Sequence, residues 1–247
     1  MVNKSISVFF PVFNEEGNIK KCILLVKRYL DKRFKDYEIL IISDGSTDNT
    51  NKLVAEFAKK DKRIKLFTRK KRLGYGAGLR FGFAHASKDL IFYTDSDNQF
   101  NIEDLDKLFP LLNSYDIVSA YRVKRKDPLM RIFIAYVYNL LIRILFGLKI
   151  RDIDASFKLY KSEIFDKMRL VTNTGLTDAE VLIKAQKLGF KIGQIGVVHY
   201  PRLKGRTSYE VGYRNKVFAI VRPRVIIDVL LEIKTLRSDL RKYEGVS

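Results

Sequence analysis

Cysteine is almost absent from this chain of 247 residues, in which Cys22 is the single example. One cysteine cannot form an internal disulfide, which predicts a reducing, cytoplasmic environment. No secretory signal is expected, because the first ten residues lead directly into a strand-like segment. The composition excludes wholesale disorder, since hydrophobic residues make up 47% and charged residues 30% of the chain.

Long uninterrupted hydrophobic runs are missing as well. The two most apolar segments, residues 132–148 and 217–231, contain charged residues such as Arg143 and Asp228. A membrane-spanning helix needs ~20 apolar residues with few charges, so neither segment is expected to cross a bilayer. Both are instead expected to lie in a membrane interface, with basic residues at the lipid headgroups.

Acidic residues are scarce relative to basic ones, with 28 Asp and Glu against 47 Lys and Arg, which gives a net charge of +19. Such an excess predicts a polyanionic partner: a nucleic acid, an anionic membrane surface or a phosphorylated ligand. No helix-turn-helix, RNP or zinc-ligand spacing supports a nucleic-acid-binding protein, which stays a remote alternative.

Strand-like and helical segments alternate along the first half of the chain. This alternation predicts an α/β fold with a mostly parallel sheet that helices cover on both faces. Ligands of such sheets bind beyond the carboxyl ends of the strands. The expected strands are 6–13, 37–42, 64–67, 90–94 and 116–120, and the expected helices are 18–30, 49–58, 76–86 and 102–109.

The second half of the chain is less regular. It contains expected helices over 129–146 and 176–188, strands over 157–160 and 191–199, and a final amphipathic helix over 225–234. We therefore expect one α/β domain over residues 1–212 and a C-terminal tail of amphipathic interface helices over residues 213–247.

The third expected strand leads into a basic, glycine-rich loop over residues 69–78, and the helix after it offers its N-terminus to an anion. There is no Walker-type loop, and no G-x-G-x-x-G follows the first strand, which weakens the nucleotide-hydrolase and dehydrogenase interpretations. Acidic turns follow the first, second and fourth strands, over residues 11–16, 43–48 and 95–99. All three are expected at the carboxyl edge of the sheet, where a ligand would bind.

The sharpest chemical signal is the pair Asp95 and Asp97. Side chains at i and i+2 of an extended segment point to the same side, so these two carboxylates repel each other. Mg²⁺ or Mn²⁺ accepts one or two carboxylates and completes its shell with substrate phosphates and water. The pair therefore predicts a divalent-cation site at which a departing diphosphate is neutralised.

Together the three turns resemble the motifs of the family 2 glycosyltransferases, which have a GT-A fold. The resemblance covers residues 5–210 and is strongest to the polyprenyl-phosphate branch, the dolichol-phosphate mannose synthase-like enzymes. It implies a Rossmann-like, mostly parallel sheet and an inverting, metal-dependent hexosyltransferase that uses a nucleotide-diphosphate sugar. The residues that carry it are Pro11-Val12-Phe13-Asn14-Glu15, Asp44-Gly45-Ser46-Thr47-Asp48 and Asp95-Ser96-Asp97-Asn98-Gln99.

The resemblance also implies roles for individual residues. Asp97 is implied to be the main ligand of the metal, with Asp95 and Gln99 beside the metal and the diphosphate. Two positions depart from the family pattern: Ser43 stands where a first Asp is common, and Phe13 stands where Tyr is common. The implied donor-binding residues are Pro11, Phe13, Glu15, Asp44, Gly45, Ser96 and Arg202.

Basic residues further along the chain are implied to bind the acceptor phosphate, namely Arg122, Arg131 and Arg206. Asp178 stands at the position of the general base in family members that act on hydroxyl acceptors. A hydroxyl must lose its proton as the new bond forms, whereas an ionised phosphate needs no base. Asp178 is therefore a catalytic candidate only for an alcohol acceptor, and otherwise a helix-capping residue.

The leading hypothesis is transfer of a hexose from a nucleotide-diphosphate sugar to a polyprenyl phosphate, either dolichyl or undecaprenyl phosphate. The enzyme would be peripheral on the cytoplasmic face of the membrane, with room for a separate membrane-protein partner. The alternative is a family 2 glycosyltransferase with a hydroxyl acceptor, such as a polysaccharide or a lipid-linked glycan. These motifs identify neither the sugar nor the lipid.

Overall fold

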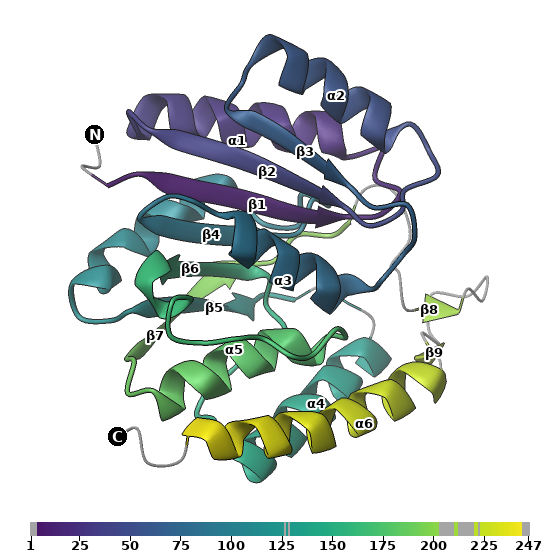
Figure 1. The fold of residues 1–247 in the computed structure, drawn as a ribbon, viewed down its shortest axis with the longest axis vertical. Coiled ribbons are helices and arrows are strands. Elements are labelled where there is room, and N and C mark those ends of the chain that lie inside the picture. The colour runs from purple at the N-terminus through teal and green to yellow at the C-terminus, as the bar shows by residue number, and fades with distance from the viewer. Residues whose placement is uncertain are drawn as a thin grey trace.

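The computed structural model describes residues 4–125, 127, 129–202, 210–211, 220–221 and 223–243. Seven strands form one sheet in the order β3-β2-β1-β4-β6-β5-β7 (Figure 1). Only β6 within this sheet runs antiparallel to its neighbours, so the predicted mostly parallel sheet is confirmed. The strands are β1 Ile6–Val12, β2 Tyr37–Ser43, β3 Ile64–Thr68, β4 Leu90–Thr94, β5 Ile117–Val123, β6 Phe157–Lys161 and β7 Ile192–Val198, and a separate two-stranded sheet pairs β8 Glu210–Val211 with β9 Ile220–Val221.

The central strand β1 shows why helices cover both faces of the sheet. Val8 and Phe10 point into one hydrophobic core and Phe9 into the other, and all three are fully buried. Because successive side chains of a strand point to opposite faces, a continuous apolar run requires cover on both sides. One face is covered by α1 Ile19–Arg33 and α2 Thr50–Lys60, and the other by α3 Tyr75–His85 and α5 Leu176–Lys187 (Figure 1).

The helix predicted over residues 102–109 is instead a pair of short 3₁₀ helices, η1 Ile102–Lys107 and η2 Phe109–Asn113. Pro110 does not end a helix but lies in the first turn of η2, where its missing N–H is not needed. Two further single-turn 3₁₀ helices are η3 Ser162–Ile164 and η4 Arg241–Tyr243.

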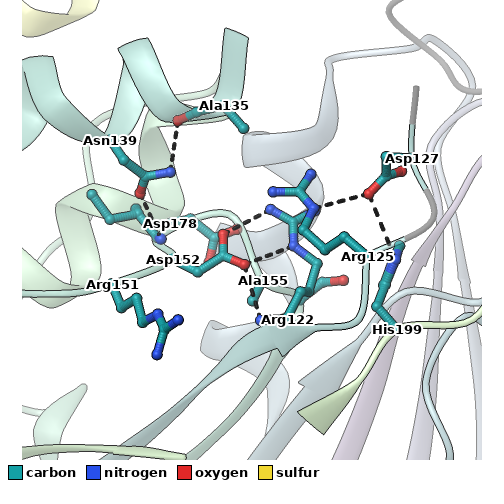
Figure 2. Close-up of polar contacts among 12 residues, drawn as sticks. Arg122, Arg125, Asp127, Ala135, Asn139, Arg151, Asp152, Ala155, Asp178 and His199 are labelled. Carbon is teal, nitrogen blue, oxygen red and sulfur yellow. Dashed lines mark hydrogen bonds and ion pairs between the residues drawn. The ribbon is translucent and has the colours of Figure 1, made fainter. Parts of the chain in front are cut away.

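Helix α4 Leu129–Phe146 contacts the rest of the protein through the fully buried Ile142 and through two polar residues. The Asn139 side chain is 6% exposed and accepts a hydrogen bond from the N–H of Ile153 at 2.8 Å (Figure 2). One turn later, Arg143 donates to the carbonyl of Ile150 at 2.9 Å. The large apolar side chains that remain exposed on α4 are Leu129, Met130, Phe133, Tyr136, Val137, Leu140 and Ile144.

Helix α4 also bears on the expectation that neither apolar segment crosses a bilayer. Its 18 residues have a mean hydropathy of 1.8 and only 11% of them are buried, which is long and apolar enough to cross a membrane by length and composition alone. It is the one helix in the described part of the chain that meets this criterion. The apolar run considered in the sequence covered residues 132–148, whereas the helix, as expected, begins at Leu129. Because this criterion concerns length and composition only, the expectation that neither segment crosses a bilayer stays a prediction.

The C-terminal helix α6 Pro223–Leu240 packs on α5 rather than standing apart. Ile233, Leu236 and Leu240 are buried in the same core as the apolar residues of α3 and α5. Lys184 of α5, itself fully buried, forms an ion pair of 2.6 Å with Asp239 of α6. Although α6 lies beyond the boundary expected at residue 212, its inner face shares the core of the α/β domain.

This shared core predicts the effect of truncating Leu236. We expect Leu236→Ala to lower the free energy of unfolding by about 2–5 kcal/mol, because the side chain is fully buried. Leu230→Ala is the matched control on the same helix, since Leu230 is 54% exposed and should change stability by less than ~0.5 kcal/mol. Urea unfolding followed by circular dichroism measures both, and equal effects of the two variants would contradict a docked α6.

Candidate active site

A cavity of about 840 Å³ lies beyond the carboxyl ends of β1, β2 and β4. All three acidic turns contribute side chains to it, as the strand order predicts. Its other walls come from the loop before α3, from residues 173–175 before α5, and from α4 and α6. The cavity therefore extends from the carboxyl edge of the sheet to α4 and α6, the two helices with exposed apolar residues. Figure 1 shows these two helices together at the bottom of the molecule.

Hydrogen bonds connect the first two acidic turns. Asn14, which has a left-handed backbone with φ of 53°, donates its N–H to Ser46 Oγ at 3.1 Å. The Asn14 side chain accepts from the N–H of Thr47 at 2.8 Å. The next residue, Glu15, donates its N–H to Thr50 Oγ1 at 2.8 Å. These contacts bring the carboxylate of Glu15 into the cavity wall.

The Asp44 carboxylate organises the loop that leads into α3. It accepts hydrogen bonds from the N–H of Leu73 at 2.9 Å and of Gly74 at 2.8 Å. The adjacent Gly45 has a φ of +74°, and a Cβ at this position would lie 2.9 Å from the backbone N of Arg72. Glycine is therefore required at residue 45 for the two loops to approach this closely.

Three arginines line the cavity, and two of them, Arg72 and Arg202, lie beside the acidic turns. The guanidinium of Arg72 lies 3.9 Å from the ring centroid of Phe13. Arg202 forms an ion pair with Glu15 and lies 3.4 Å from the Asp97 carboxylate. Guanidinium groups present planar donors that match phosphate oxygens, so both side chains are suited to contact a diphosphate.

Asp95 and Asp97 follow β4 and lie side by side in the cavity wall. The Asp95 carboxylate accepts hydrogen bonds from Ser156 Oγ at 2.7 Å and from the Tyr75 hydroxyl at 3.3 Å. Burial raises the pKa of Asp97 to about 7, and the neighbouring Asp95 carboxylate adds to that rise. Burial also raises the pKa of Asp95. Two carboxylates that share a buried site are costly to ionise together unless a cation lies near them.

This donor set fits a hard divalent cation. Carboxylate oxygens are the ligands that Mg²⁺ and Mn²⁺ prefer, and such ions usually take only one or two of them from a protein at a diphosphate site. Among the described residues, no cluster of three or more His, Cys, Asp or Glu side chains has the arrangement of a metal site. Asp95 and Asp97 would therefore hold the ion together with oxygens from the substrate and from water.

Residues 7–169 match the model of a family described as Glycosyl transferase family 2. The chain belongs to this family. Its matched region contains all three acidic turns and the sheet up to β6. The family resemblance seen in the sequence is thereby confirmed.

Curated relatives of this family 2 chain include polyprenyl-phosphate sugar transferases. It is 30% identical over 167 residues to undecaprenyl-phosphate 4-deoxy-4-formamido-L-arabinose transferase of Salmonella choleraesuis, an alignment that covers 67% of this chain and 51% of that protein. It is 27% identical over 216 residues to glycosyltransferase AglD of Haloferax volcanii, covering 83% of this chain and 34% of that protein. The chain thus spans between a third and about half the length of these relatives.

Solved structures confirm the GT-A-like fold. The chain resembles glucosyl-3-phosphoglycerate synthase of Mycobacterium tuberculosis in complex with Mn²⁺, UDP and glucosyl-3-phosphoglycerate, with a TM-score of 0.66 and 17% identity over 99% of this chain and 81% of that one. A structure of the same synthase with Mn²⁺ and UDP-glucose gives a TM-score of 0.63 and 20% identity over 83% of this chain and 73% of that one.

Most of the implied donor residues of the family 2 chain line the cavity. They are Pro11, Phe13, Glu15, Asp44, Ser96 and Arg202, together with Asp95 and Asp97. Gly45 does not line the cavity, but its lack of a side chain allows the loop of Arg72, which does line it, to approach closely. Gln99 also lies outside the wall: its side-chain amide donates to the carbonyl of Tyr200 at 2.9 Å, and it is 6% exposed. Its amide thus joins the turn after β4 to the segment after β7.

Of the three residues implied to bind the acceptor phosphate, only Arg131 is found in the cavity wall among those that the structure describes. Arg131 lines the cavity and forms an ion pair of 3.2 Å with Asp127. Arg122 is directed elsewhere: its guanidinium binds both oxygens of Asp152, at 2.8 and 2.7 Å (Figure 2). This pair is almost fully buried, so Arg122 is a structural partner of Asp152 rather than part of the cavity wall. Arg206 lies outside the described residues.

The implied general base Asp178 also lies outside the cavity wall. It is 3% exposed, and its carboxylate forms an ion pair of 2.9 Å with the fully buried Lys158. The Tyr93 hydroxyl donates to the same oxygen of Asp178. Local sequence gave no sign of this partner, because Lys158 is 20 residues away and lies on β6.

Several cavity residues were missed by the sequence patterns. Arg72 and Tyr75 belong to a loop that was recognised only as basic and glycine-rich, and Tyr75 contacts Asp95. Glu232 on α6 accepts hydrogen bonds from the N–H of Asn173 at 2.7 Å and from Thr174 Oγ1 at 2.6 Å. Glu232 carries no local signal, since its partners precede it by nearly 60 residues.

The neighbouring carboxylates of Asp95 and Asp97 predict the effect of neutralising Asp97. We expect Asp97→Asn to weaken Mn²⁺ binding more than ~100-fold, because even changes around metal ligands cost about 10–100-fold. Isothermal titration with MnCl₂ measures this. Asp36→Asn is the matched control, because the Asp36 side chain is 63% exposed and pairs with Lys88. Unchanged Mn²⁺ affinity in Asp97→Asn would contradict the metal site.

A buried histidine near the cavity predicts a pH effect on stability. Burial lowers the pKa of His199 to about 4, although the Asp127 carboxylate lies 3.7 Å away (Figure 2). The unfolded chain, with a histidine pKa of ~6.5, binds the proton more readily, so stability falls as pH drops from 6.5 towards 4. We expect His199→Asn to reduce the loss of unfolding free energy between pH 7 and pH 5 by about 1–2 kcal/mol. Urea unfolding at both pH values measures it, and an unchanged difference would contradict a neutral buried His199.

Proposed function

We propose that this family 2 chain is an inverting, metal-dependent glycosyltransferase that moves a hexose from a nucleotide-diphosphate sugar to a polyprenyl phosphate at the membrane surface. One observation carries the proposal. A single cavity contains the Asp95 and Asp97 carboxylates, suited to a divalent cation, at one end and reaches helices with exposed apolar faces at the other. Such a cavity suits a polar donor and an amphipathic acceptor at the same time.

The charges at one end of the cavity and the solved structures of relatives support the binding of a nucleotide-diphosphate sugar there. The Mycobacterium tuberculosis synthase binds Mn²⁺ with UDP or UDP-glucose. When bound here, Mg²⁺ or Mn²⁺ would supply Lewis-acid stabilisation of the departing diphosphate. Arg202, beside Glu15 and Asp97, would donate to diphosphate oxygens, and fixed donors of this kind stabilise charge that develops on the leaving group.

The reaction follows from this placement of charge. An oxygen of the acceptor phosphate attacks the anomeric carbon from the face opposite the diphosphate, a new C–O bond forms, and the bond to the nucleotide diphosphate breaks. The configuration at the anomeric carbon is inverted. No proton has to leave a phosphate that is already ionised, which agrees with the absence of Asp178 from the cavity wall.

The acceptor end lies between α4 and α6. Arg131 of α4 and Leu231 of α6 both line the cavity there, so this end of the cavity offers a cation and an apolar side chain together. Arg131 would bind the acceptor phosphate, and the prenyl chain would leave along the apolar surfaces of the two helices. A relative of this chain is an undecaprenyl-phosphate sugar transferase, which supports an acceptor of this class.

The outer faces of α4 and α6 support binding to a membrane surface, which we propose to be the cytoplasmic face. Ile227, Leu230 and Leu231 of α6 are between 54% and 62% exposed, and Phe133 of α4 is 61% exposed. Large exposed apolar patches mark interaction surfaces. Basic residues around these helices would add attraction to anionic lipids of ~1 kcal/mol each near the surface. They include Lys124, Arg125, Lys149, Lys234 and Arg237.

A donor and acceptor panel tests the proposal. Radiolabelled GDP-mannose, UDP-glucose and related donors are incubated with a short polyprenyl phosphate, and label that partitions into organic solvent is counted. We expect one donor to give a lipid product with Mg²⁺ or Mn²⁺ and none with EDTA. Arg131→Gln should raise the KM for the lipid with little change in the KM for the donor. Transfer to hydroxyl acceptors alone would overturn the lipid assignment and favour the alternative acceptor class.

A further inference from the structure

A buried ion pair lies behind the candidate metal site. Asp178, in the first turn of α5, and Lys158, on β6, are 3% and 0% exposed and lie 2.9 Å apart. The Tyr93 hydroxyl also donates to Asp178. A buried charge is tolerated only with a partner of opposite charge and with its remaining hydrogen bonds satisfied, and this pair meets both conditions.

Lys158 extends the contacts towards the cavity. Its ammonium donates to the carbonyl of Ala155 at 2.6 Å, and the N–H of Phe157 donates to the same carbonyl at 2.9 Å. The turn before β6 is therefore bound at Ala155 from two directions. Ser156, the residue between these contacts, directs its hydroxyl to Asp95 Oδ2 at 2.7 Å.

The second oxygen of Asp95 is also oriented by a hydroxyl. Tyr75, at the start of α3, donates to Oδ1 at 3.3 Å, so donors from two separate elements orient one carboxylate. A hydrogen-bond donor to a metal-binding carboxylate sets which lone pairs face the metal. Ser156 is the closer of the two donors, and its own position depends on Lys158.

We propose that Ser156 and the Lys158–Asp178 pair are positioning residues that orient Asp95 for the divalent cation, and that Asp178 takes no proton from the acceptor. The inference rests on the proposed metal-dependent transfer and assigns roles within that site. Asp178 acts through Lys158, the carbonyl of Ala155 and the hydroxyl of Ser156. A general base, in contrast, would have to contact the acceptor, and Asp178 does not line the cavity.

The first test removes the contact to Asp95. We expect Ser156→Ala to raise the Kd for Mn²⁺ about 10–100-fold, as loss of a partner of a metal ligand usually does. Turnover should recover towards the wild-type kcat when Mn²⁺ is saturating. Ser114→Ala is the matched control, because Ser114 is exposed and far along the chain at the end of η2. Isothermal titration with MnCl₂ in the absence of donor measures binding, and an unchanged Kd for Ser156→Ala would overturn the role of Ser156.

The second test separates positioning from proton transfer. The double variant Lys158→Met/Asp178→Leu removes both charges together, so neither is left buried without a partner. We expect it to fold, to bind Mn²⁺ more weakly, and to regain turnover within tenfold of wild type at saturating Mn²⁺. Lys161→Met/Asp116→Leu is the control, because that ion pair also involves β6 but lies at the other end of β4 from Asp95.

A base and a positioning pair give opposite results in this variant. Wild-type Mn²⁺ binding with no turnover at any Mn²⁺ concentration would overturn the proposal and make Asp178 the base. If the double variant does not fold, Asp178→Asn decides by the same criterion, with circular dichroism to check folding. Mn²⁺ binding needs neither donor nor acceptor, so a wrong acceptor assignment leaves this test intact. Wild-type protein that binds no Mn²⁺ would contradict the metal site and the positioning role together.

Discussion

The repulsion between Asp95 and Asp97 is the constraint around which this structure is arranged. Asp97 is buried and Asp95 partly buried at the end of β4, and burial together with the Asp95 charge raises the pKa of Asp97. Such a pair is stable only where donors and cations surround it. Arg202 contributes a cation, and Ser156 and Tyr75 contribute hydroxyl donors. These side chains come from the segment after β7, the turn before β6 and the start of α3, so elements distant in sequence converge on one point.

The sequence predicted the parts of this arrangement that depend on local pattern. Continuous apolar runs identified the strands, because a strand buried on both faces cannot alternate polar and apolar residues. The position of each acidic turn at a strand end then placed three motifs at one edge of the sheet, and the cavity contains all three. The antiparallel β6 was recognised as a strand, but its direction was not, since the direction of a strand depends on the long connection before it.

Side-chain partners that are distant in sequence could not be predicted from local sequence patterns. Arg122 and Arg131 lie in similarly basic stretches, yet Arg122 pairs with a buried Asp152 while Arg131 reaches the cavity. Asp178 has the residue type of a base, but its partner Lys158 is on another element. The α6 residues gave the pattern of an amphipathic helix without indicating what its polar face contacts. In each case the deciding partner is distant in sequence, so the residue type alone permits several roles.

Helix α6 links the apolar surface to the donor side of the cavity through direct contacts. Its outer face has exposed Leu230 and Leu231, while Glu232 accepts from the backbone N–H groups of residues 173 and 174. That segment packs tightly on α3: a Cβ on Gly76 would lie 2.2 Å from the carbonyl oxygen of Thr174. The start of α3 is in turn joined to Asp44 through the N–H of Gly74. A displacement of α6 would therefore be transmitted to the donor wall through two hydrogen-bonded carboxylates, Glu232 and Asp44, and the packed backbone between them, which makes the C-terminal helix a structural part of the cavity.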